Sequence, residues 1–138
     1  MEKISRNQEN FIIMTVIYDE LSDYTAGNSA FRDVNEIILQ ITDVPLNEHS
    51  AYVQNCIANV LSHYGEIVSA FQPYLRGWVW ERLPLLTRAV LLMSYAHFYY
   101  VEKIDKSIVI NVAVDLSKKY IEEKQAKFVN AILDEVLK

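Results

Sequence analysis

The chain has 138 residues, of which 51% are hydrophobic and 22% charged, so it is long enough to bury a core and too apolar to be disordered. Three glycines and three prolines are too few for the tight turns of an all-β fold, and a net charge of −5 provides no general basic field for nucleic acid. The single cysteine excludes an internal disulfide and is typical of a reducing compartment. We therefore expect an all-α protein of the cytoplasm, with one domain over residues 1–138.

The first predicted element is a helix from about residue 6 to residue 23. Ser5 and Gln8, three residues apart, form the capping-box pattern of a helix N-terminus, and a nearly continuous apolar run follows them. The stretch TAGNS ends this helix, because Gly27 or Asn28 can adopt a positive φ angle.

Two more helices are predicted in the N-terminal half. Ser29 is expected to cap the first of them, whose apolar side chains recur on one face as far as Ile41. After the loop TDVPLN, Asn47 is expected to cap the longest helix, which keeps a 3.6-residue apolar spacing to about Gln72. Gly65 weakens this long helix without clearly ending it.

The segment QPYLRGWVWERLP (residues 72–84) contains two prolines and a glycine, which indicates an internal boundary. It divides the chain into an N-terminal helical layer, about 1–73, and a C-terminal layer, about 74–138. Pro84 fits the first turn of the next helix, the apolar run 85–101. That run is short for a membrane span and contains polar side chains, so we expect a buried central helix and no membrane association.

Two amphipathic helices complete the chain, one over about 107–121 and one from about residue 124, which gives six or seven helices and no strands. Where they meet, four lysines occur within ten residues, interleaved with Tyr120 and Phe128. These lysines are Lys118, Lys119, Lys124 and Lys127. Two glutamates offset half of their charge, so the pattern fits either a solvated turn or a nucleic-acid contact.

The sequence contains no catalytic constellation. Its three scattered glycines cannot form a phosphate-binding loop. His49, Cys56 and His63 are spaced seven residues apart, which on a helix separates neighbours by about 10 Å along the axis. That distance is too great for a thiol–imidazole hydrogen bond or a shared metal ion. We therefore expect a protein that is not an enzyme and needs neither a metal nor a cofactor.

Two motifs follow each other in the C-terminal half, IVINVAVDLSKKY (108–120) and KFVNAILD (127–134). PYL (73–75), an arginine-leucine pair (82–83) and TRAVLLMSY (87–95) precede them. In order and spacing these motifs resemble the NusB family of transcription antitermination factors. The resemblance covers the whole chain and is strongest from PYL onward.

The resemblance implies an all-helical fold of two three-helix bundles and a role in antitermination, chiefly on ribosomal RNA operons. NusB-like proteins pair with a small-subunit ribosomal protein, called NusE in this context, and grip the boxA element of nascent, single-stranded RNA in the transcription elongation complex. Carried over position by position, the RNA face would be Arg6, Asn7, Gln8, Asn10, Tyr74, Lys127 and Phe128, with Lys124 nearby. Glu81 and Arg82, near the boundary between the layers, are our prediction for contacts with the ribosomal protein.

The stretch SRNQEN departs from the family pattern. At the family's N-terminal arginine positions this chain keeps only Arg6, and Asn7, Gln8 and Asn10 replace the rest. Each lost cation removes a phosphate contact, so we expect weak RNA binding in the absence of the protein partner. Amides can still bond to base edges, and the stretch can serve as a helix cap, an RNA-binding arm or both. The alternative function is a NusB-fold scaffold that binds protein and has little RNA affinity.

Overall fold

The computed structural model describes residues 4–28 and 30–138, and in these residues the regular structure is entirely helical. The α-helices are α1 (Arg6–Thr25), α2 (Val34–Thr42), α3 (Ala51–Ser62), α4 (Tyr64–Phe71), α5 (Leu85–Ala96), α6 (Lys106–Tyr120) and α7 (Glu123–Val136). Short turns η1 (Leu46–Glu48), η2 (Gln72–Tyr74) and η3 (Trp80–Arg82) are 3-10 helices, and η4 (His97–Val101) is a π-helix. The predicted all-α fold is confirmed. No helix in the described ranges is long and apolar enough to cross a membrane.

The N-terminus of α1 is closed by the predicted capping box. The Ser5 hydroxyl accepts a hydrogen bond from the Gln8 backbone N–H at 3.1 Å, and the Gln8 side-chain oxygen accepts one from the Ser5 N–H at 2.9 Å. These two bonds satisfy amide groups that have no partner inside the helix. The helix ends at Thr25, two residues later than predicted, and Gly27 follows with a φ of 107°.

The caps of α2 and α3 differ from the prediction. Ser29 lies outside the described residues, and the cap of α2 is Asp33, whose carboxylate accepts from Asn35 N–H at 3.1 Å. Asn47 does not cap α3, because it lies inside η1. The Ser50 hydroxyl caps α3 instead. The chain makes the additional 3-10 turn η1 before α3. The helix therefore begins later than predicted, and the later cap-type residue Ser50 caps it in place of Asn47.

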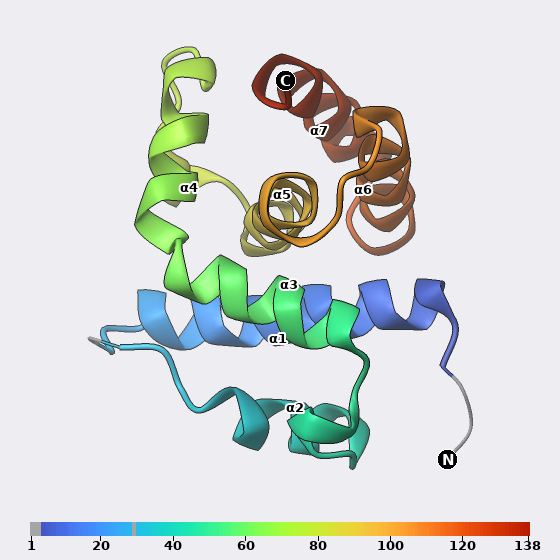
Figure 1. Ribbon diagram of the computed structural model, residues 1–138. Helices are drawn as coiled ribbons and strands as arrows, with labels where there is room; N and C mark the ends of the chain where they lie inside the picture. Colours follow the sequence, from blue (N-terminus) through green and yellow to red (C-terminus); the bar gives the residue numbers. More distant parts are fainter. Residues whose placement is uncertain (1–3, 29) are drawn as a thin grey trace.

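The prediction of a single long helix from residue 47 to residue 72 is wrong, because this segment forms two helices, α3 and α4, that meet at His63. His63 has φ −112° and ψ 17°, which ends α3 and begins α4 in a new direction. Figure 1 shows α3 alongside α1, whereas α4 lies beside α5. The boundary predicted near residue 73 is therefore not a break in the packing, since α4 also contacts α5 and α7.

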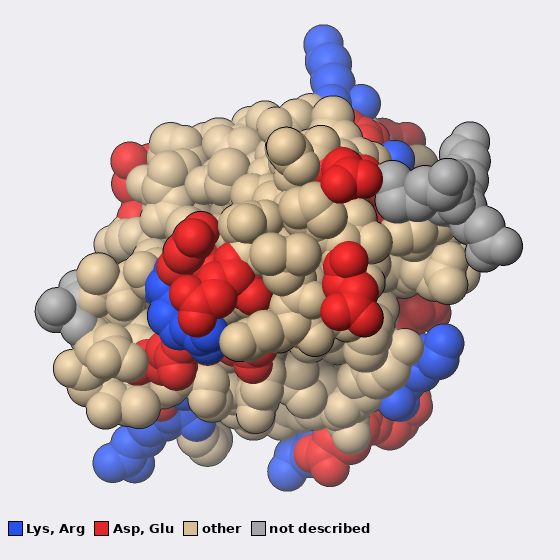
Figure 2. Space-filling view, turned by 90° about the horizontal axis from the view of Figure 1, so that it is seen from below, with Lys and Arg blue, Asp and Glu red and all other residues tan. Residues whose placement is uncertain are grey.

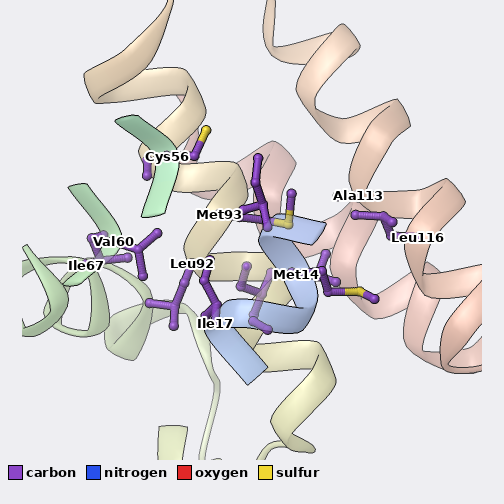
Figure 3. Packing of buried hydrophobic residues seen from close by; sticks show 14 of the residues in the cluster. Met14, Ile17, Cys56, Val60, Ile67, Leu92, Met93, Ala113 and Leu116 are labelled. Atoms are coloured by element: carbon purple, nitrogen blue, oxygen red, sulfur yellow. The ribbon is translucent and has the colours of Figure 1, made fainter. Parts of the chain in front are cut away.

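Helix α5 forms the centre of the core, and α1, α3, α4, α6 and α7 all pack against it. This confirms the buried central helix predicted from the sequence. Figure 3 shows how side chains from five helices meet around it. They are Met14 and Ile17 of α1, Cys56 and Val60 of α3, Ile67 of α4, Leu92 and Met93 of α5, and Ala113 and Leu116 of α6. Each fully buried large side chain contributes about 1.5–3 kcal/mol, so this contact region dominates the stability.

The end of the predicted apolar helix changes character at His97. From His97 to Val101 the chain forms a π-helical turn, which contains more residues per turn than an α-helix. His97 is buried there, whereas Tyr99 is exposed. The turn ends at Glu102, whose carboxylate reaches the N-terminus of α1.

Candidate RNA-binding surface

The predicted RNA-binding residues of α1 have three different environments. Gln8 contributes its side-chain oxygen to the capping box, so this polar group already has a structural role. Asn10 is only 3% exposed, and its side-chain oxygen accepts a hydrogen bond from the hydroxyl of Tyr52 on α3. Arg6 and Asn7 are exposed at the start of the helix. Asn10 is therefore almost entirely buried, although it lines the floor of a hollow that Asn7 also lines.

Arg6 is exposed but has several partners within the protein. Its guanidinium pairs with Glu9 at 3.3 Å and with Glu102 at 3.3 Å. Its Cζ atom also lies 3.7 Å from the centre of the Tyr52 ring, which is a cation–π contact. Arg6, the one arginine that this chain keeps at those N-terminal positions, is thus held by two carboxylates and an aromatic ring. An RNA phosphate must compete with these carboxylates for it.

His97 is the other neighbour of Glu102. Its Nε2 atom lies 3.5 Å from a Glu102 oxygen, and its ring packs edge-on against Tyr52 with centroids 5.0 Å apart. Burial lowers the pKa of His97, although the charge of Glu102 acts in the opposite direction. His97 is therefore neutral at neutral pH. The negative charge of Glu102 is balanced by Arg6 and not by His97.

Asn7 lies beside the C-terminus of α6, where two hollows of about 330 and 340 Å³ meet the surface. Lys119 and Tyr120 line both of these hollows together with Asn7. The Tyr120 ring packs on Phe11 of α1, with centroids 4.9 Å apart. The sequence placed Lys119 and Tyr120 in a basic cluster and did not connect them to the α1 residues. The only indication of a role for these two residues was their position at the end of an amphipathic helix.

Two of the remaining predicted residues lie at the other end of the α6–α7 turn. Lys124 and Phe128 of α7 line a hollow of about 370 Å³ together with Arg82 of η3. Lys127 is exposed on the same helix, and Tyr74 in η2 is half-buried against the core, but neither of them lines this hollow.

Glu81 and Arg82, predicted for the protein partner, are both exposed in η3. The buried Arg88 holds this segment, because its guanidinium donates to the carbonyls of Glu81 at 3.2 Å and Leu83 at 2.9 Å. Arg82 shares its hollow with Lys124 and Phe128. Arg82, predicted for the protein partner, therefore lies beside two of the residues predicted for RNA.

The face formed on the α1–α2 side of the molecule has a different character. Figure 2, which views the protein from below, shows a mostly uncharged surface with clusters of acidic side chains and most of the basic ones at its rim. One basic residue of this region, Arg32, is neutralised by Asp23 at 3.0 Å and Glu36 at 3.2 Å. The acidic clusters on this face disfavour contact with a polyanion.

The fold and these positions define a small all-α protein that presents basic and aromatic side chains at two places, one on either side of the α6–α7 turn. The NusB family profile matches residues 12–138. The chain belongs to the NusB family.

Curated relatives are similar over most of the chain. A transcription antitermination protein NusB from Nitratiruptor sp. is 27% identical over 134 residues, which cover 97% of this chain and 92% of that protein. The protein of the same name from Lacticaseibacillus paracasei is 33% identical over 99 residues, which cover 71% of this chain and 70% of that protein.

Solved NusB structures share the fold. T. maritima NusB superposes with a TM-score of 0.81 at 21% identity, covering 99% of this chain and 92% of that one. NusB in a crystal structure of antitermination factors NusB and NusE with double-stranded RNA superposes with a TM-score of 0.72 at 20% identity. It covers 97% of this chain and 98% of that one. At these identities the similarity shows that the helical architecture is shared.

Proposed function

We propose that this protein is a transcription antitermination factor that binds boxA-type RNA of nascent ribosomal transcripts together with the small-subunit ribosomal protein NusE. It acts in the cytoplasm within the transcription elongation complex, as a binding protein without catalytic activity. Membership of the NusB family supports the class of function. The names of the relatives, transcription antitermination proteins, support the process.

One observation carries the RNA-binding part of the proposal. Lys124 and Phe128 line the same hollow as Arg82, and Lys127 is exposed on the same helix. Cations that contact phosphates and an aromatic ring that stacks on a base are the two components of single-strand recognition. Here three positive charges and one aromatic ring occur within a short stretch of surface.

A second candidate function is a scaffold that binds the ribosomal protein and has little affinity for RNA. The environment of α1 favours it: Gln8 serves the cap, Asn10 is buried, and Arg6 is held by Glu9 and Glu102. If RNA gains no contact there, only the α7 side remains to bind it. The two candidates differ in the response to salt, because phosphate contacts weaken as salt rises and apolar protein contacts respond less.

The test is binding of a fluorescently labelled boxA-type RNA at two salt concentrations, with and without the ribosomal protein, and with a scrambled RNA for comparison. The informative variant is the double substitution Arg6→Ala, Lys127→Ala. A matched control, Lys103→Ala with Lys138→Ala, removes two exposed positive charges that lie outside the predicted site.

If the protein acts through RNA, it should bind boxA RNA more tightly than the scrambled RNA, and this binding should weaken as salt rises. Only the Arg6→Ala, Lys127→Ala variant should bind more weakly than the wild type. Equal binding of both RNAs in the presence of the ribosomal protein, with the two proteins still associated, would support the scaffold. Equal loss in both double variants would mean that affinity depends on overall charge and not on the predicted site.

A further inference from the structure

Trp78 is the most exposed large hydrophobic side chain in the described part of the protein, at 60%. Two residues later, Trp80 is 1% exposed and stacks on Phe71 with ring centroids 5.7 Å apart. The second tryptophan therefore anchors the segment in the core while the first extends into solvent. A single exposed apolar residue is common on protein surfaces, so exposure alone identifies no site.

The backbone that carries Trp78 is fixed in place. Its N–H donates to the Leu75 carbonyl at 3.1 Å, and its carbonyl accepts from the Gln72 amide at 3.1 Å. Gly77, with a φ of 93°, makes the tight turn before it, and Arg76 pairs with Glu135 of α7 at 2.6 Å. These contacts hold the loop against α7, so the backbone that carries the indole has a fixed position.

The indole borders the hollow already described between η3 and α7. The residues that line it are Trp78, Arg82, Leu83, Pro84, Lys124, Gln125 and Phe128. The lining thus includes two cationic and two aromatic residues beside apolar ones, and none of these described lining residues is acidic. Another hollow, of about 760 Å³ beside Arg6 and Tyr52, differs in this respect, because three carboxylates, those of Glu9, Glu48 and Glu102, line it.

Gln125 adds a fixed polar group to the hollow. Its side-chain oxygen accepts a hydrogen bond from the hydroxyl of Thr87 at 2.8 Å, and Thr87 is fully buried. This bond sets the orientation of the amide, so its nitrogen is the end that can donate to a ligand. A donor beside two aromatic rings can meet the polar edge of a heterocycle that lies between them.

We infer that this hollow binds one unpaired nucleobase of single-stranded RNA, stacked on Trp78, with the adjoining phosphates contacted by Arg82 and Lys124. The inference rests on the proposed function and extends it to a residue that the family resemblance did not assign. Charge complementarity favours this ligand, since the lining of the hollow includes two cations and no carboxylate, which suits a polyanion. A stacking platform is the usual partner of such cations in single-strand recognition.

The experiment measures binding of labelled boxA-type RNA in the presence of the ribosomal protein, with Trp78→Ala, Trp78→Phe and the control Val79→Ala. Val79 is the adjacent exposed apolar residue. Loss of a stacked base corresponds to an affinity loss of about 5- to 100-fold. We expect a loss in that range for Trp78→Ala, a much smaller one for Trp78→Phe and none for Val79→Ala. Circular dichroism and the melting temperature confirm that each variant is folded.

A set of RNAs with one base removed at each position locates the contact. Wild-type protein should lose affinity at one particular position, and Trp78→Ala should lose no further affinity there, because the stacked base is already without its platform. RNA should also quench tryptophan fluorescence in the wild type and not in Trp78→Phe.

The inference is overturned if boxA-preferring binding is unchanged in Trp78→Ala, and the proposed function then still stands. It is also overturned if Trp78→Ala reduces binding of the ribosomal protein and leaves RNA binding unchanged, because the hollow would then hold a protein segment. If the wild type has no preference for boxA RNA over a scrambled one, the proposed function fails and the nucleobase site fails with it.

Discussion

The guanidinium of Arg6 lies over the ring of Tyr52, 3.7 Å from its centre, and this contact joins the start of α1 to α3. The same guanidinium pairs with Glu9 and Glu102. Tyr52 in turn donates a hydrogen bond to the buried Asn10. One exposed residue of the predicted RNA face is therefore connected to the interior through a single aromatic side chain.

Releasing Arg6 from Glu102 should strengthen RNA binding. Glu102→Gln removes a carboxylate that competes with phosphate for the guanidinium, and an exposed ion pair is worth about 0.2–1 kcal/mol. We expect a gain in RNA affinity of about two- to fivefold at low salt, measured by fluorescence anisotropy. Glu66→Gln is the control, since Glu66 is exposed and removal of its charge leaves Arg6 unaltered. An equal gain in both variants would attribute the effect to net charge.

Separating the cap from the arm requires two neighbouring substitutions. Ser5→Ala breaks the capping box and should lower the free energy of unfolding by about 1 kcal/mol. Asn7→Ala should leave stability nearly unchanged, because Asn7 is exposed and alanine favours a helix. Urea titration measures both. If SRNQEN also acts as an arm, Asn7→Ala lowers RNA affinity despite its normal stability. If it is only a cap, RNA affinity stays at the wild-type value.

Glu20 should make stability depend on pH. It is fully buried and accepts a hydrogen bond from the Arg32 backbone N–H at 2.7 Å. Burial raises the pKa of Glu20 from 4.5 to about 7, and the interactions with Arg32 offset only part of this rise. Between these two values the folded protein holds a proton that the unfolded chain releases, so stability falls as pH rises through that window.

The Glu20→Gln variant tests this pH dependence. Glutamine stays neutral and can still accept from the Arg32 N–H, so the variant should be more stable than wild type at pH 8, by up to about 3 kcal/mol. At pH 4.5 the difference should be small. Urea unfolding at both pH values measures it. A variant with the same pH slope as the wild type would mean that another group is responsible.

The salt dependence of RNA binding should identify the phosphate contacts at the α7 hollow. For single-stranded nucleic acid each phosphate contact contributes about 0.7 to the slope of log affinity against log salt. Arg82→Ala and Lys124→Ala should each reduce the slope by about that amount, and Lys103→Ala should not. A weaker affinity with an unchanged slope would mean that these side chains act through packing and do not contact phosphate.

The sequence predicted the class of fold and most helices because burial repeats with the helical period. It could not predict the break at His63, since α3 and α4 continue the same apolar spacing and only the backbone angles of one residue change. It also missed the π-helical turn after His97. The extra residue in that turn alters which side chains face the core, and no periodic pattern records it.

The candidate site was predictable in part. Phe128 was assigned through the KFVN motif and Lys124 as a nearby cation on the same predicted helix, and both line one hollow. Asn10 was assigned by the family resemblance, but it is buried and bonded to Tyr52. This burial could not be predicted, because Tyr52 lies 42 residues away in the sequence and no local pattern connects the two. Trp78 was not among the predicted site residues, since its exposure beside the hollow depends on how η3 and α7 meet.

The contact between Tyr120 and Phe11 has a consequence for the order of synthesis. Asn7 and Phe11 are synthesised more than a hundred residues before Lys119 and Tyr120, which complete the hollows beside them. The central helix α5, against which α1 packs, also emerges much later than α1. The surface beside Asn7 therefore cannot form during synthesis until α6 has left the exit tunnel and packed against α1.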